Sequence, residues 1–357
     1  MKTSPFTRIF AVAALLAAAI AGIARTGEPA ENFATTDISD LALIYQGSRH
    51  RIDWNKEEIE PYVTHRFADG TEDWLFDGFL FLDFKDGSGY AYTPLMDSLA
   101  ARKEHWEWYL DRVFERGKGL DALDKCIGEK KKTLGEPPFR HKVVLTVPVP
   151  FPGQTDWGEL DGRALDFNNI ADRKAAVIWF IDRLTDGFAA QEYQNIDIDG
   201  IYFLAEDIAT TKDFPREIAE HIHSRGLKFV WIPYFMAEGH RRWRELGFDI
   251  AYHQPNHFFE AHIPDSRLDD AIDEALRYGM AIEFECDERA LESSADGFAP
   301  RMDAYIDAFE RHGVFERSAI AYYTGNHLFL DFSRERTPAN VRLADRLARH
   351  IVNRHKK

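Results

Sequence analysis

Eight apolar segments of strand length recur along this chain, and each ends in polar or aromatic residues. Most are near-continuous apolar runs rather than alternating patterns, which is typical of parallel strands covered on both faces. The segments are 41–47, 74–84, 142–150, 199–207, 228–235, 249–259, 280–288 and 319–330. No linker or low-complexity tract divides 40–355, so we expect all eight segments in one domain.

Helical patterns separate most of these segments. Apolar residues repeat at helical spacing within 99–113, 170–184, 214–222, 268–276, 302–309 and 341–351, and a shorter helix fits 238–246. This alternation predicts an α/β fold, a single (β/α)8 barrel of the TIM type, with an open doubly wound sheet as the alternative.

Three connections depart from the regular pattern. Residues 48–73 show no clean helical period, so we expect an irregularity between the first two strands, either a short helix or an inserted strand. Residues 117–141 and 151–164 read as long loops. Only the second follows a strand, and only that loop should border a site at the carboxyl end of a barrel.

The N-terminus reads as a secretory signal peptide over 1–24, followed by a flexible segment over 25–39. Lys2 and Arg8 precede an apolar run of about 15 residues, too short for a membrane span, and small residues suit cleavage after Ala24. We therefore expect a secreted or periplasmic protein without a membrane span after cleavage. An uncleaved N-terminal anchor is the alternative.

The excess of acidic residues disfavours some classes of binding partner. The chain has 44 basic and 60 acidic residues and a net charge of −16, which argues against nucleic acid and anionic membranes as partners. A neutral or cationic substrate is expected. Cys126 and Cys286 are the only cysteines, so one disulfide is conceivable, but Cys286 lies in an apolar strand and fits a small packed hydrophobe better.

Several motifs together resemble the DUF4855 family of uncharacterised bacterial proteins. They are "LIYQG", "DGFLFL", "KFVWIPYF", the spacing from Trp243 to Asp249 (W-x-x-x-GFD), "QPN" and "IEFE", in the family's order over roughly 40–330. The family is grouped with glycoside-hydrolase-like TIM barrels, and the resemblance therefore implies a carbohydrate-active barrel. It does not supply a catalytic pair.

The strand ends provide candidate site residues, because barrel enzymes build their sites where strands end and the following loops begin. Carboxylates, amides and aromatic rings are the side chains that bind sugars. The candidates for substrate binding are Gln46, Asp83, Trp157, Asp207, Tyr234, Tyr252, Gln254, Asn256, His257, Tyr323 and Asn326.

Two glutamates stand out as a catalytic pair. Glu206 ends the fourth strand and Glu285 ends the seventh, and glycoside hydrolysis needs one protonated and one ionised carboxyl. We predict Glu206 as general acid/base and Glu285 as nucleophile. Glu283 lies on the same face of the strand, about 6–7 Å deeper, and is the rival for the second role.

The sequence thus predicts an exported glycoside hydrolase acting on a polysaccharide or oligosaccharide, with a retaining mechanism if the two carboxyls lie close together. A non-catalytic carbohydrate-binding barrel is the alternative. No cofactor and no metal are expected. A metal-dependent hydrolase or deacetylase is disfavoured because no His-x-x-Glu-His motif or Asp/His cluster is recognisable at the strand ends.

Overall fold

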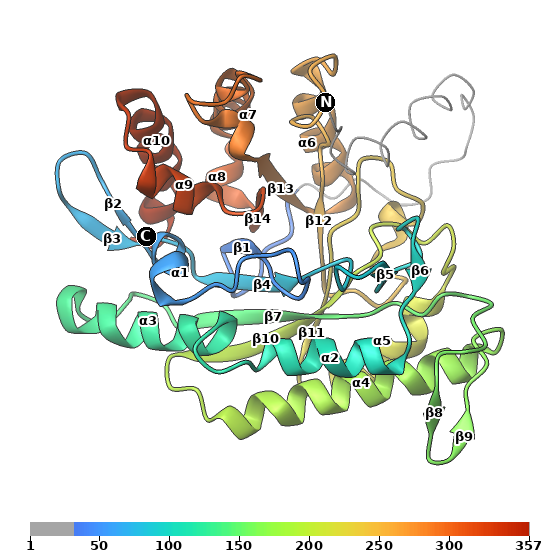
Figure 1. Cartoon of the computed structure of the whole chain (residues 1–357). Helices are drawn as coiled ribbons and strands as arrows, with labels where there is room; N and C mark the ends of the chain where they lie inside the picture. Colours follow the sequence, from blue (N-terminus) through green and yellow to red (C-terminus); the bar gives the residue numbers. More distant parts are fainter. Residues whose placement is uncertain (1–31, 357) are drawn as a thin grey trace.

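The computed structural model describes residues 32–356, and its centre is a closed barrel of eight parallel strands (Figure 1). Neighbouring strands follow the chain order β1, β4, β7, β10, β11, β12, β13, β14, and β14 pairs with β1. Each of the eight predicted segments contributes one strand, so the predicted (β/α)8 barrel is confirmed and the open sheet is excluded. The bounds are β1 Asp40–Tyr45, β4 Gly78–Leu82, β7 His141–Val147, β10 Ile196–Phe203, β11 Lys228–Trp231, β12 Ile250–His253, β13 Ala281–Cys286 and β14 Ile320–Thr324.

Helices surround the barrel and cover the outer faces of its strands (Figure 1). They are α1 Lys56–Val63, α2 Lys103–Val113, α3 Gly119–Leu134, α4 Ile170–Gln191, α5 Phe214–Ser224, α6 Ser266–Tyr278, α7 Ala299–His312, α8 Val314–Arg317, α9 Leu328–Arg334 and α10 Pro338–Arg354. Between β11 and β12 the connection holds a 3-10 turn, His240–Arg242, where a short helix over 238–246 was predicted.

The irregular connection 48–73 contains both of the predicted features, α1 and a hairpin of β2 (Thr64–Arg66) and β3 (Glu72–Trp74). Two further small pairs lie in loops, β5 (Tyr90–Ala91) with β6 (Leu99–Ala100) and β8 (Glu159–Leu160) with β9 (Arg163–Ala164).

The prediction that 117–141 is a loop is wrong, because α3 occupies most of it. Leu120, Leu123 and Ile127 are buried and recur at helical spacing on one face. Lys131 and Lys132 lie in the last turn of this helix, where positive charge complements the helix dipole.

The predicted signal peptide, residues 1–24, lies outside the described residues. Of the segment 25–39, residues 32–39 differ from the expected flexible chain. Phe33 and Ile38 are buried, and Ala34 accepts a backbone hydrogen bond from Ala319 and donates one to Met280. Within residues 32–356 we find no helix whose length and apolar character would allow it to cross a membrane.

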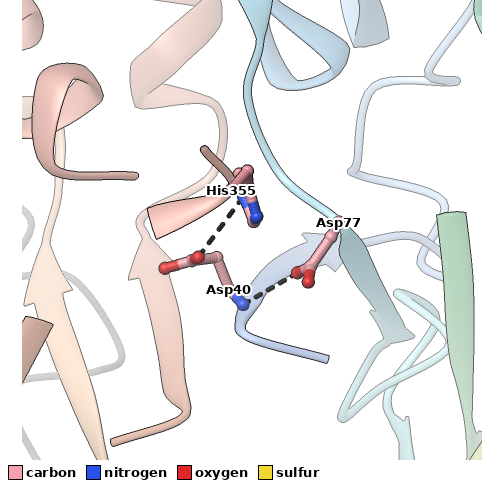
Figure 2. Close-up of side chains that lie close together, drawn as sticks. All are labelled: Asp40, Asp77 and His355. Carbon is pink, nitrogen blue, oxygen red and sulfur yellow. Dashed lines mark hydrogen bonds and ion pairs between the residues drawn. The ribbon is translucent and has the colours of Figure 1, made fainter. Parts of the chain in front are cut away.

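The C-terminal end of α10 closes the amino end of the barrel. Arg354 lies 2.9 Å from the Asp40 carboxylate and donates further hydrogen bonds to the carbonyls of Ser39 and Ser318. Asp77 accepts the backbone amide of Asp40 at 2.8 Å, and the His355 ring lies 3.4 Å from Asp40 (Figure 2). This cluster joins the start of β1, the start of β4 and the end of α10.

Candidate active site

The carboxyl end of the barrel carries three glutamates from two strands. On β13, Phe284 packs outward against Phe309 of α7, with ring centroids 5.6 Å apart. Alternate residues of a strand point to opposite faces, so Glu283 and Glu285 point toward the barrel interior. Glu206 comes three residues after the end of β10. The predicted convergence of these side chains is supported by their mutual effects on pKa, since Glu206 and Glu285 both raise that of Glu283.

Glu206 is the only one of these three glutamates that is partly exposed. Desolvation raises its pKa to about 7, and the charge of Glu285 adds to the rise, while a hydrogen bond with Gln254 opposes it. A carboxyl of this kind holds a proton close to neutral pH and can exchange it with water.

Glu285 is fully buried but rich in hydrogen-bond donors. Its Oε1 accepts the backbone amide of Asn256 at 3.1 Å and the Asn256 Nδ2 at 3.3 Å. Its Oε2 accepts the backbone amide of His257 at 3.2 Å and the hydroxyl of Tyr305. Burial raises the pKa of Glu285 to about 7, whereas these donors lower it. We therefore assign the negative charge of the cluster to Glu285, because four donors stabilise its anion, whereas Glu206 has the hydrogen bond with Gln254 alone.

Glu283 lies one pleat deeper and is 2% exposed. Among the described residues, no side chain or backbone amide donates a hydrogen bond to its carboxyl, and burial together with the charges of Glu285 and Glu206 raises its pKa well above the usual value. Glu283 therefore holds a proton when Glu285 is ionised.

Two amide side chains, Gln254 and Asn256, and a fourth acid, Asp207, lie next to these three glutamates. Gln254 donates to the Ile232 carbonyl at 2.9 Å and accepts from Asn256 at 2.9 Å. Asp207 accepts the hydroxyl of Tyr234 at 2.5 Å. Glu206, Gln254, Asn256 and Glu285 thus lie in one hydrogen-bonded network. The Asp207–Tyr234 pair lies beside it, because the backbone amide of Tyr234 donates to the carbonyl of Glu206 at 3.4 Å.

A second group of predicted residues lies at the ends of β14, β1 and β4. Here Arg51 bonds Asp83 at 3.2 Å and also bonds Asn326, while its guanidinium lies 4.5 Å from the ring centre of Tyr45. Tyr323 packs edge-on against Tyr45, with 5.9 Å between ring centroids. Arg51 was not predicted as a site residue, because it lies in the segment 48–73, which has no recognisable helical period.

Four predicted site residues do not join these groups. Gln46 points to the helix layer and donates to the Arg112 carbonyl. Trp157 is 1% exposed and packs against Trp106 and Trp179, so it offers no free ring to a sugar.

The other two are Tyr252 and His257. Tyr252 pairs in register with Ala281, the first residue of β13, and therefore lies deep in the barrel. The ring of His257 lies behind Glu285 and bonds Asp265 at 2.8 Å. Periodicity gives the order of residues along a strand but not the depth of each residue in the barrel.

Three tyrosines near the glutamates were also missed. Tyr202 of β10 and Tyr45 of β1 are buried, and the charges of Glu206 and Glu283 raise the pKa of both hydroxyls beyond the effect of burial. Tyr305 lies in a helical pattern that reads as core packing, and only its hydroxyl, bonded to Glu285, distinguishes it. The sequence carries no signal for this bond.

Two further expectations from the sequence concerned the cysteines and the absence of metal ligands. Cys126 and Cys286 are both free and buried, so they do not form a disulfide. The expectation that the strand ends carry no Asp/His cluster is wrong, because Glu288, His327 and Asp331 bring ligand atoms within 4.8 Å of one another beyond β13 and β14. This cluster is not recognisable in the sequence, because its residues come from two separate segments, one after β13 and one after β14.

The geometry defines the class as a closed (β/α)8 barrel with a cluster of carboxyls at the carboxyl end of its strands. The chain belongs to the DUF4855 family, a domain of unknown function, whose family model matches residues 40–349. The resemblance seen in the sequence is thus confirmed. Among curated proteins, none matches this chain.

Solved structures of the tryptophan synthase alpha-subunit from Pyrococcus furiosus are similar in backbone course. Two of its mutants and a further form give TM-scores of 0.39, 0.38 and 0.38 at 11%, 11% and 10% identity, and each match covers 90% of this chain and 98% of the other. At these values the similarity says nothing about activity, and the fold rests on the strand order itself.

Proposed function

We propose that this protein is an exported glycoside hydrolase that cleaves a polysaccharide or oligosaccharide with two carboxyl groups. The observation that carries the proposal is the chain of hydrogen bonds between Glu206, after β10, and Glu285 of β13. Gln254 bonds Glu206 and accepts from Asn256, which also donates to Glu285. One protonated and one ionised carboxyl is the requirement of glycoside hydrolysis. The fold is one that enzymes commonly use, with their sites at this end.

Glu206 takes the role of general acid/base in this proposal. Its pKa of about 7 keeps a proton available near neutral pH, and its partial exposure lets the proton return from water after each cycle. Neither Glu283 nor Glu285 combines these two properties, because both are buried.

Glu285 takes the role of the ionised carboxylate that attacks the sugar, as in a retaining mechanism. Its four donors favour the anion, whereas Glu283 lacks donors among the described residues and keeps its proton. Attack requires Oε1 to give up one hydrogen bond, and the bond from Asn256 Nδ2, at 3.3 Å, is the longest of the four.

Substrate contacts are assigned to the side chains of the same end. Gln254, Asn256, Asp207 and Tyr234 would bind hydroxyls beside Glu206. Asp83, Tyr323 and Asn326, ordered by Arg51, would bind the sugar on the opposite side of the barrel.

The test is a screen of the mature protein against polysaccharides and aryl glycosides, with Glu206→Gln, Glu285→Gln and Glu283→Gln. Glu220→Gln, on the exposed face of α5, is the matched control. We expect the Glu206 and Glu285 variants to lose about 10²–10⁴-fold in kcat, and azide to restore turnover only in the Glu285 variant. Azide rescue of the Glu283 variant instead would transfer the nucleophile role to Glu283.

A non-catalytic carbohydrate-binding barrel is the second candidate, and the complete burial of Glu285 favours it. The same variants separate the two functions. An enzyme with Glu206→Gln retains sugar binding but loses turnover, whereas a binding protein shows no turnover in any form and changes only in affinity.

A further inference from the structure

A group of three potential metal ligands lies outside the glutamate trio, beyond the ends of β13 and β14. Glu288 begins a 3-10 turn after β13, His327 immediately precedes α9, and Asp331 lies in the first turn of α9. The Nδ1 atom of His327 is 2.8 Å from Asp331 Oδ2 and 3.9 Å from Glu288 Oε1. One imidazole and two carboxylates therefore present ligand atoms to a common point.

The carboxylate of Glu288 is fixed in place by the neighbouring loop. Its Oε1 accepts the backbone amides of Asn326 at 2.6 Å and His327 at 2.8 Å. Gly325 has φ of 65°, and a Cβ at this position would lie 2.5 Å from Glu288 Oε2. Any side chain at 325 would thus collide with the carboxylate, so the loop leaves room for it.

The charge of this group is not balanced by a basic side chain. Among residues 32–356, no lysine or arginine lies within ion-pair distance of Glu288 or Asp331, and only His327 does. The adjacent Asp287, by contrast, has Arg289 at 2.6 Å.

A second group of potential metal ligands among the described residues, Asp40, Asp77 and His355 at the amino end, differs because a basic side chain balances its charge. Asp40 already accepts hydrogen bonds from Arg354 and from the hydroxyl of Tyr322. Asp77 accepts the backbone amides of Ser39 and Asp40, and Figure 2 shows the bond from Asp40. Arginine supplies the positive charge there. At the carboxyl end the corresponding charge is missing, and the three ligands are partly open to solvent, with side chains 16–30% exposed.

We propose that Glu288, His327 and Asp331 form a binding site for a divalent transition-metal ion, with Zn²⁺ and Mn²⁺ as its probes. Imidazole favours zinc, carboxylates favour manganese, and three protein ligands leave room for water. The ion links the loops after β13 and β14 and thereby holds Asn326, which accepts a hydrogen bond from Arg51 in the loop after the neighbouring strand β1. The site does not depend on the proposed hydrolysis.

The test is isothermal titration of chelator-treated, untagged mature protein with ZnCl₂ and with MnCl₂. We expect one equivalent to bind, and the dissociation constant to rise at least ~10-fold in Glu288→Gln and in Asp331→Asn. Both substitutions keep the shape of the side chain. His312→Gln is the matched control, because His312 lies 2.8 Å from Asp269, whose charge Arg311 balances. This variant should bind like wild type.

X-ray absorption of the zinc-loaded wild-type protein gives a check that does not depend on variants. We expect one imidazole and oxygen ligands in the first coordination sphere, and loss of the imidazole signal in His327→Gln. The proposal is overturned if wild type shows no saturable binding, if the Glu288 and Asp331 variants bind like the His312 control, or if the bound ion has no imidazole ligand. Glycosidase assays play no part in these outcomes.

Discussion

The substitution Arg354→Met should strongly destabilise the fold, because it removes the charge that compensates Asp40. Asp40 is fully buried, and its carboxylate accepts Arg354 Nε at 2.9 Å and the Tyr322 hydroxyl at 2.7 Å. Methionine keeps most of the volume but leaves the carboxylate with Tyr322 and with His355 at 3.4 Å.

The magnitude follows from the burial of this pair. Removing one partner of a buried ion pair costs about 3–5 kcal/mol. The carbonyls of Ser39 and Ser318 also lose the hydrogen bonds that Arg354 donates. We expect the free energy of unfolding to fall by about 3 kcal/mol or more, because His355 can compensate only part of the charge.

The assay is urea unfolding at pH 7, followed by tryptophan fluorescence. Arg342→Met on the same helix is the control, because Arg342 pairs with Asp303 but is 55% exposed, and such a pair contributes about 0–1 kcal/mol. Equal midpoints and slopes for the two variants would refute the view that the C-terminal end of α10 closes the barrel through a buried charge.

Three further outcomes follow from the titratable groups. Turnover should decrease as the pH rises through about 7, because Glu206 acts while protonated and its pKa is about 7, and a pH–rate profile of kcat measures this limb. Asp77 has its pKa raised to about 7 by burial, so between pH 4 and 7 the folded state holds a proton that the unfolded state has released, and its contribution to stability falls as pH rises. The free energy of unfolding of Asp77→Asn, measured with urea at several pH values, should therefore rise relative to that of wild type toward pH 7. A difference between the two proteins that does not change with pH would contradict this expectation. Burial raises the thiol pKa of Cys126 to about 12 and that of Cys286 well above its usual value. A thiol reagent should thus find no reactive thiol in the native protein and two after denaturation, whereas none after denaturation would indicate a disulfide.

The barrel was predictable because its strands are buried on both faces. A near-continuous apolar run such as 142–150 is hard to place anywhere else, and the spacing of eight such runs leaves few architectures. The helix α3 was not predicted, because polar residues rather than apolar ones are prominent in its sequence. Lys130, Lys131 and Lys132 dominate its sequence, although Lys130 pairs with Glu60 and Glu72 and lies mostly buried.

The candidate site was only partly predictable, because the direction of a side chain at a strand end depends on where the strand leaves the barrel. Glu283 and Glu285 follow the strand alternation and Glu206 comes shortly after β10, so counting strands placed all three at the carboxyl end. Gln46 also ends a strand but turns into the helix layer. Tyr305 contributes a hydroxyl from a helix whose pattern indicates only packing.

The two ends of the barrel treat buried carboxyls in different ways, and this difference carries the functional argument. At the amino end Asp40 has an arginine, and the cluster contributes to stability. At the carboxyl end Glu285 has neutral donors, and Glu283 and Glu206 keep elevated pKa values. Arginine beside these glutamates would fix them as anions and remove the proton that acid catalysis requires. Two arginines of this rim, Arg51 and Arg289, form ion pairs with Asp83 and Asp287 instead. Asp77 at the amino end shows that a single buried acid with backbone donors can belong to the fold alone. The feature that supports the proposed chemistry is therefore the grouping of three carboxyls at the carboxyl end, where none of them forms an ion pair with a described lysine or arginine.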